Sequence, residues 1–199
     1  MQTRSKETCS QIKKAAIEEF CRSGYDAASV SDICRKAGVS KGAFYYHFSS
    51  KQVLFLAIME DWLQGIDTQL FANRVPEKKV IQSIQDMGST LGVIFKAASG
   101  QLPMFMEFMV QASHDKEVWN AVIAPYRQYQ QSFSGLINEG KKDGSFRKDV
   151  DAGEAAWVLI SLAVGILLQG VVDPRAADWE SVTNKGVQMI LDGLHRREA

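Results

Sequence analysis

The chain has 199 residues, of which 46% are hydrophobic and 23% are charged. These proportions are ordinary for a folded domain and exclude collagen-like, low-complexity and wholly disordered chains. A chain of this length buries roughly 70% of its unfolded surface, so it can form a core without disulfides or metal.

Charge is unevenly distributed along the chain. Residues 1–51 contain nine basic and five acidic side chains, a net charge of +4, and the remainder carries −4. A basic segment followed by an acidic one favours a polyanion as the partner of the N-terminal segment. Chance alone also produces such an imbalance often, so the charge pattern needs support from a motif.

The cysteine pattern indicates a reducing compartment. Cys9, Cys21 and Cys34 are odd in number and lack the short spacings of a zinc site or disulfide framework. The first ten residues are polar and lack the apolar core of a signal peptide. We therefore expect a cytoplasmic protein with no metal and no cofactor.

Apolar residues recur at helical spacing almost throughout, and sustained alternation typical of strands is missing. The sequence predicts an all-α fold of about nine helices. The first covers residues 6–23 and ends at Gly24, a common residue after a helix. Ser29 and Asp32 then form a capping box, in which the hydroxyl binds the amide of residue 32 and the carboxylate reaches back. The short helix that follows ends at Gly38.

A third short helix comes directly after this glycine turn, so the pair has the size of a helix-turn-helix, whose second helix enters the major groove. Ser40 caps this helix, which runs to about Phe48 and precedes a fourth helix reaching about residue 72. Phe44 and Phe48 face inward. The remaining side chains face outward or sideways: Lys41, Gly42, Ala43, Tyr45, Tyr46 and His47. Such hydroxyl and ring groups can contact phosphates, sugars and thymine methyls, and small residues allow close approach to the bases.

The segment from Gly38 to Leu54 resembles the recognition segment of the TetR family of bacterial transcriptional repressors, and residues 12–33 resemble its first two helices. The motif is specific over about the first 55 residues; beyond them only helix number and length agree. The resemblance implies a helix-turn-helix DNA-binding domain at residues 1–51 and a helical effector-binding and dimerisation domain at residues 52–199.

The resemblance also implies which positions contact DNA: Ser29, Ser31, Ser40, Lys41, Gly42, Ala43, Tyr45, Tyr46, His47 and Lys51. Lys41 to Ala43 occupy the edge of the helix that reads the bases. Tyr46 occupies the position that packs over a sugar and a base edge. Lys51 occupies a position from which its ammonium can reach the DNA backbone. Ser31 departs from several members, which carry Arg or Lys there, so this protein reads one position fewer. Two structural alternatives are open: Tyr45 at the edge of the core, and His47 as the cap of the fourth helix.

The later helices are expected at residues 80–94, at 103–123 as one broken helix, from Pro125 at the first turn of a seventh, at 151–172 and at 178–195. Bulky and adaptable residues are frequent in them. Such residues are more often plain core, but as a group they resemble the family's central cavity for a small, mostly hydrophobic or aromatic effector. The candidate lining residues are Trp62, Met87, Leu91, Phe105, Met106, Met109, Tyr126, Tyr129, Phe133 and Trp157.

Residues 155–172 form a stretch of 18 residues without a charged side chain, and 18 residues is about the lower length limit for a membrane span. Acidic flanks and Pro174 argue against a span, and a helix buried in a core on one side and in a subunit interface on the other has the same composition. Small residues in the eighth and ninth helices allow four helices of two chains to pack closely. We expect a homodimer through these helices, with a buried hairpin within a monomer as the alternative.

These features predict a ligand-responsive repressor that binds a palindromic double-stranded DNA operator as a dimer and is released by its effector. The three histidines are scattered, and the sequence contains no hydrolase, zinc-protease, P-loop or dinucleotide fingerprint, so we expect no enzymatic activity. Because residues 155–172 are not expected to span a bilayer, we also expect no membrane partner. An activator of the same family and a helical adaptor that does not bind DNA are the alternatives.

Overall fold

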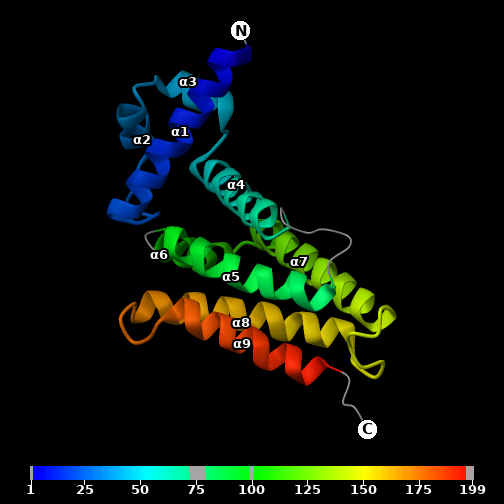
Figure 1. The fold of residues 1–199 in the computed structure, drawn as a ribbon. Helices are drawn as coiled ribbons and strands as arrows, with labels where there is room; N and C mark the ends of the chain where they lie inside the picture. Colours follow the sequence, from blue (N-terminus) through cyan, green and yellow to red (C-terminus); the bar gives the residue numbers. More distant parts are fainter. Residues whose placement is uncertain (1, 72–78, 99–100, 196–199) are drawn as a thin grey trace. The chain divides into compact units, whose positions relative to one another are not determined.

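The computed structural model describes residues 2–71, 79–98 and 101–195, and its regular elements in that part of the chain are nine helices (Figure 1). The predicted all-α fold is therefore confirmed. The helices are α1 Gln2–Ser23, α2 Val30–Ala37, α3 Lys41–His47, α4 Lys51–Phe71, α5 Val80–Ala98, α6 Leu102–Ala112, α7 Lys116–Lys142, α8 Ala152–Val172 and α9 Trp179–Leu194.

Contacts group the chain into two compact units, residues 1–64 with 100–122 and residues 65–99 with 123–199. The first unit contains α1 to α3, most of α4, α6 and the start of α7. The expected functional boundary at residue 51 falls inside this unit, because α4 and α6 pack with the N-terminal helices. The second unit contains α5, α8, α9 and the longer part of α7.

The core of the first unit follows the predicted periodicity. Ile12, Ala16 and Phe20 lie four residues apart on α1 and are at most 1% exposed. The Phe20 ring lies 5.5 Å from that of Phe55 of α4. Other buried apolar side chains of the neighbouring helices are Ile33, Phe44, Phe48 and Leu54. Full burial of each large apolar side chain contributes roughly 1.5–3 kcal/mol, so this stripe anchors the short helices α2 and α3.

Glycines end the first two helices as predicted. Gly24 and Gly38 have φ angles of 81° and 67°, a left-handed conformation that is costly for residues with a Cβ. The amide of Gly38 donates to the carbonyl of Arg35, which closes the end of α2. The chain can therefore turn sharply between α2 and α3.

Two predicted boundaries are wrong. The first helix begins at Gln2 instead of residue 6. More importantly, α7 runs from Lys116 to Lys142 through Pro125, which we expected to open a new helix. A proline inside a helix removes one backbone hydrogen bond, but buried side chains on both sides of it, including Val122 and Leu136, keep the long helix together.

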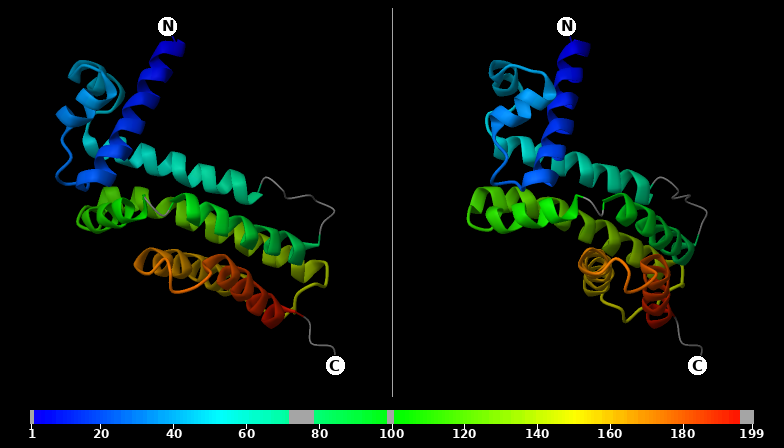
Figure 2. Two further views of the ribbon diagram at one scale, coloured as in Figure 1. Left: turned by 60° about the vertical axis from the view of Figure 1, so that its left-hand side comes forward. Right: turned by 90° about the vertical axis from the view of Figure 1, so that its left-hand side faces the viewer.

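In the second unit, α8 and α9 lie side by side, and α9 also packs on α5 (Figures 1 and 2). Glycine permits these close approaches: a Cβ at Gly186 would lie 2.9 Å from Leu162, and one at Gly88 would lie 3.1 Å from Val187. The buried cluster between the helices includes Ile84, Met87, Leu136, Ile137, Phe146, Leu159 and Leu191. By length and composition alone, α8 is also apolar enough to cross a membrane.

Candidate nucleic-acid interface

Serine caps begin both helices of the helix-turn-helix. The Ser29 hydroxyl accepts a 3.1 Å hydrogen bond from the amide of Asp32 and donates to its carboxylate at 2.5 Å. The predicted capping box is confirmed, with the carboxylate bound to the hydroxyl. The Ser29 hydrogen bond and the nearby Arg35 hold the pKa of Asp32 below its ordinary value. At α3, the Ser40 hydroxyl accepts from the amide of Ala43 at 3.1 Å.

Helix α3 presents its two tyrosines outward. Tyr46 is 80% exposed and Tyr45 is 54% exposed, whereas Phe44 is fully buried and Phe48 is 5% exposed. The Tyr45 ring also meets the buried Phe44 ring edge-on, with centroids 5.3 Å apart, which agrees with the alternative that places Tyr45 at the edge of the core. Lys41 and Gly42 are exposed beside these tyrosines, and Ala43 and His47 are half-buried. The exposed side of α3 thus offers a cation, two phenol hydroxyls and, at Gly42, a position without a side chain.

His47 packs in the aromatic row of α3, with its ring centroid 5.0 Å from that of Tyr46. The cap of α4 is supplied by Ser50, whose hydroxyl accepts from the amide of Val53 at 3.1 Å. The alternative of His47 as the cap of the fourth helix is therefore wrong.

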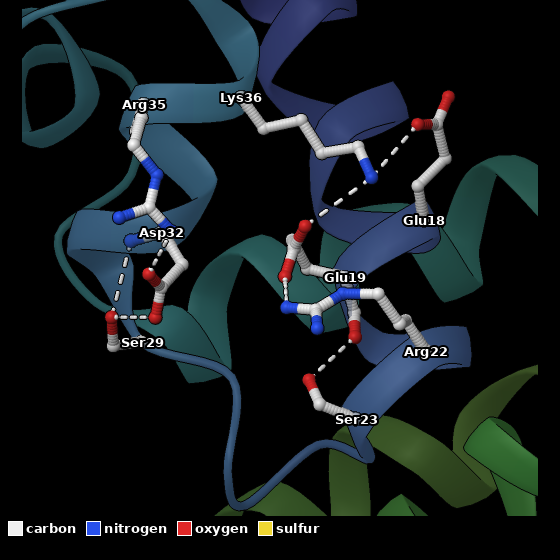
Figure 3. A network of polar contacts seen from close by, with 8 residues as sticks. All are labelled: Glu18, Glu19, Arg22, Ser23, Ser29, Asp32, Arg35 and Lys36. Carbon is white, nitrogen blue, oxygen red and sulfur yellow. Dashed lines mark hydrogen bonds and ion pairs between the residues drawn. The ribbon is translucent and has the colours of Figure 1, made fainter.

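A network of charged side chains joins α1 to α2 (Figure 3). Glu19 is 6% exposed and accepts from Arg22 at 2.5 Å and from Lys36 at 3.2 Å. Lys36 also pairs with Glu18 at 3.1 Å. The hydrogen bond from Arg22, with that from Lys36, lowers the pKa of Glu19 below its ordinary value. Sequence reasoning missed this network because Lys36 lies 17 residues from Glu19.

Lys51, a predicted DNA contact, has several partners within the protein. Its ammonium donates to the backbone carbonyls of Tyr25, Asp26 and Ala28 at 2.7, 3.1 and 3.0 Å and lies 4.4 Å from the centroid of the Tyr25 ring. An ammonium has three N–H donors, and three carbonyls accept from it here. Burial lowers the pKa of Lys51. Lys51 therefore holds the loop between α1 and α2, and its contact with DNA stays a prediction.

The same loop is held by a residue that sequence reasoning missed. Glu107 of α6 accepts from the amides of Tyr25 at 2.9 Å and Asp26 at 3.4 Å. A Cβ at Gly24 would lie 3.0 Å from this carboxylate, so glycine makes room for it. The one available signal was the position of Glu107 as the single charged residue of the apolar helix α6.

Aromatic rings fill the space beneath the loop. The Tyr25 ring meets Phe55 and Phe108 edge-on, with centroids 5.3 and 5.1 Å away, and Phe55 stacks on Phe108 at 3.9 Å. These rings come from the loop, α4 and α6. Offset and edge-to-face pairs add about 0.5–1.5 kcal/mol each to the effect of burial, so the loop rests on a rigid base.

The predicted effector-binding residues are divided between the two units. In the first unit, Trp62 stacks on Phe105 with centroids 4.6 Å apart, and Met106 is 42% exposed. Met109 also belongs to the first unit. The remaining six fall in the second unit, where Met87 is 3% exposed and Trp157 48%. The expected common cavity therefore stays a prediction. Members of the two sets are Trp62, Phe105, Met106 and Met109 in the first, and Met87, Leu91, Tyr126, Tyr129, Phe133 and Trp157 in the second.

Burial raises the pKa of the phenols of Tyr126 and Tyr129, so both stay neutral at physiological pH. A cavity of about 340 Å³ lies in the second unit at the end of α8 and the start of α9, where Leu167, Gly170 and Trp179 contribute to its wall. The residues that line it are different from the predicted set. Among the residues that the structure describes, no His, Cys, Asp and Glu side chains are grouped so that they could hold a metal ion.

Two family models match the chain. Residues 12–58 match the bacterial regulatory proteins of the tetR family, and residues 97–195 match the C-terminal part of BetI-type transcriptional repressors. The HTH-type transcriptional regulator UidR of Escherichia coli K12 is 26% identical over 194 residues, which cover 98% of this chain and 96% of UidR.

Solved structures share the fold at lower identity. The SmeT–triclosan complex has a TM-score of 0.79 and 22% identity, with 96% of this chain and 92% of that chain covered. A regulator from Saccharomonospora viridis in complex with choline has a TM-score of 0.78 and 19% identity, with 96% and 100% covered. UidR and both matching families are transcriptional regulators and not enzymes. Together with the capped helix-turn-helix, the matches show that the chain is a DNA-binding transcriptional regulator of the TetR family.

Proposed function

We propose that the chain is a cytoplasmic, ligand-responsive repressor that binds a palindromic operator as a homodimer and leaves it when a small, mostly hydrophobic effector binds. The observation that carries the proposal is the outward face of α3, where Tyr46 is 80% exposed beside Lys41. Large aromatic side chains are seldom left in water without a partner, and in this motif the second helix enters the major groove.

Individual roles follow from position on the helices. Lys41, Gly42 and Ala43 lie at the N-terminal end of α3, which faces the bases in this motif. Tyr45, Tyr46 and His47 contact phosphates and sugars, and Ser29, Ser31 and Ser40 contact phosphates at the helix starts. Residues 1–51 thus bind DNA, and residues 52–199 bind effector and the second subunit.

An exposed apolar face supports dimerisation through α8 and α9. Its large side chains are at least 38% exposed: Trp157, Val158, Val164, Leu168 and Val172 on α8, and Val182 and Met189 on α9. Four of those on α8, at positions 157, 164, 168 and 172, recur at intervals of seven, four and four residues and so form one stripe. Covering such a stripe with the same stripe of a second copy removes apolar surface from water at about 25 cal/mol per Å².

The effector is proposed from the chemistry of the later helices. Triclosan and choline are bound by proteins of this fold, and bulky, adaptable side chains such as Met109 and Phe133 suit an apolar guest. An effector that binds better to a conformation with displaced reading helices lowers DNA affinity by that difference, typically about 1–3 kcal/mol.

The test starts with a duplex selected from a random-sequence pool by the full-length protein. Tyr46→Ala is expected to weaken binding to this duplex about tenfold or more while leaving the unfolding temperature within about two degrees, because the exposed ring adds little to the fold. If the variant lost stability as well as affinity, Tyr46 would be a residue that stabilises the fold and not a DNA contact.

Salt dependence measures how many phosphates the basic side chains neutralise. Besides its place at the base-reading edge, the Lys41 ammonium adds a positive charge near the phosphates. Lys41→Ala is therefore expected to reduce the magnitude of the slope of log affinity against log salt by about 0.9 for each subunit, or about 1.8 for the dimer. Lys116→Ala, which changes an exposed lysine of α7, is the matched control and should leave the slope unchanged. A flat salt response of the unmodified protein would favour the adaptor.

A further inference from the structure

The loop between α1 and α2 lies between two opposite charges. Its carbonyls at Tyr25, Asp26 and Ala28 accept from the Lys51 ammonium, and its amides at Tyr25 and Asp26 donate to the Glu107 carboxylate. Both partners belong to the first unit. The peptide groups of Tyr25 and Asp26 therefore bind a cation through oxygen and an anion through nitrogen.

Each charge supports the other through the peptide groups. Hydrogen bonds to ionised partners are roughly twice as strong as neutral ones, and chains of hydrogen bonds polarise one another. Loss of either charge would leave backbone groups in a partly buried loop with a weaker partner or none, which costs more than the bond itself contributed.

The loop leads directly into the DNA-reading helices. Ala28 is 2% exposed, and the next residue, Ser29, caps α2. Helix α2 in turn packs on α3. Any displacement of residues 24–28 therefore moves the start of α2, and with it the proposed phosphate contacts at Ser29 and Ser31.

We infer that Glu107 and Lys51 are positioning residues for DNA recognition, which hold the α1–α2 loop and so place the helix-turn-helix. This inference rests on the proposed function. Because Glu107 belongs to α6, it makes DNA affinity depend on the position of that helix. An effector that displaces α6 would release the loop at Glu107 while leaving the Lys51 bonds in place.

The decisive variant is Glu107→Gln, because two explanations predict opposite signs. By long-range electrostatics alone, removing a negative charge from a DNA-binding protein strengthens its binding to DNA. A positioning role predicts a loss of about fivefold or more, within the range of mutations that act through coupling. The salt slope should stay unchanged, because Glu107 makes no phosphate contact.

The measurement is fluorescence anisotropy with the selected duplex and full-length protein. Asp61→Asn is the control, because it breaks another tie between α1 and α4, the 2.6 Å pair of Lys13 and Asp61, without touching the loop. Like Glu107→Gln, it removes one negative charge, so by long-range electrostatics alone it should bind DNA equally well or slightly more tightly. Lys51→Met should lower affinity, and the double variant with Glu107→Gln should lose less than the product of the single effects, because both act on one loop.

Amide hydrogen exchange provides a second readout. Glu107→Gln is expected to speed exchange at residues 25 and 26 and in α2, while Asp61→Asn is not. Equal or tighter DNA binding by Glu107→Gln, or unchanged exchange at the loop, overturns this inference alone. Failure of the protein to select any duplex would overturn the proposed function instead.

Discussion

Replacing Gly42 by alanine separates the stability of α3 from its fit to DNA. Gly42 is exposed at the second position of α3, and a Cβ built there would meet its nearest neighbour, the Ser40 hydroxyl, at 3.7 Å. This is ordinary contact, so the folded protein accepts the methyl group without strain. We therefore expect a more stable protein that binds DNA less well.

The magnitude follows from helix propensity. Alanine is favoured over glycine by about 1 kcal/mol in a helix interior, and somewhat less in a first turn. The free energy of unfolding should rise by about 0.5–1 kcal/mol, a shift of about 1–4 °C for a chain of this size. On DNA the methyl group would occupy the space through which the helix approaches the bases, and a tenfold loss of affinity corresponds to about 1.4 kcal/mol.

Urea unfolding and anisotropy on the selected duplex measure the two effects. Gly135→Ala is the matched control: Gly135 lies exposed in α7, and a Cβ there meets nothing within 4 Å. It should raise stability without changing DNA affinity. If Gly42→Ala bound DNA as tightly as the unmodified protein, α3 would not approach the bases at this point and the assignment of its reading edge would fail.

Two further predictions concern the α1–α2 network and the α8 face. Because its ion pairs lower the folded-state pKa of Glu19 below the ordinary 4.5, this group stabilises the fold above that pH and loses its contribution as pH falls below it. Unfolding measured between pH 3 and 7 should therefore show a smaller acid loss for Glu19→Gln than for the unmodified protein, and identical curves would contradict the assignment. Trp157→Asp should convert the proposed dimer to monomer in sedimentation experiments, since a charge replaces a ring that is 48% exposed on the apolar face. A dimer that persists in the variant would place the interface elsewhere.

Local patterns in the sequence were sufficient to predict most of the helices and to predict which face of α3 is exposed. The spacing of Ile12, Ala16 and Phe20 identified the buried face of α1, and Phe44 with Phe48 identified that of α3. Serine caps and terminal glycines act within four residues of a helix terminus, so they can be recognised from the local sequence. The resemblance of this segment to the TetR family had the same local origin.

Pro125 shows where a local rule misleads. A proline is common at the first turn of a helix, but α7 continues through position 125. Packing of distant residues on either side decides whether one lost hydrogen bond ends the helix, and that packing is invisible in the neighbouring sequence.

By itself, the sequence determined the helical class, the capped helix-turn-helix and the outward tyrosines, because each depends on residues within a few turns of one another. Tertiary structure alone decided the roles of Lys51 and Glu107. Lys51 is 26 residues from the carbonyl of Tyr25, and Glu107 is 82 residues from its amide. A charged side chain binds whichever polar groups folding brings within about 3 Å. Because nearly every residue carries the same backbone N–H and C=O groups, the sequence does not show which of them these two residues bind.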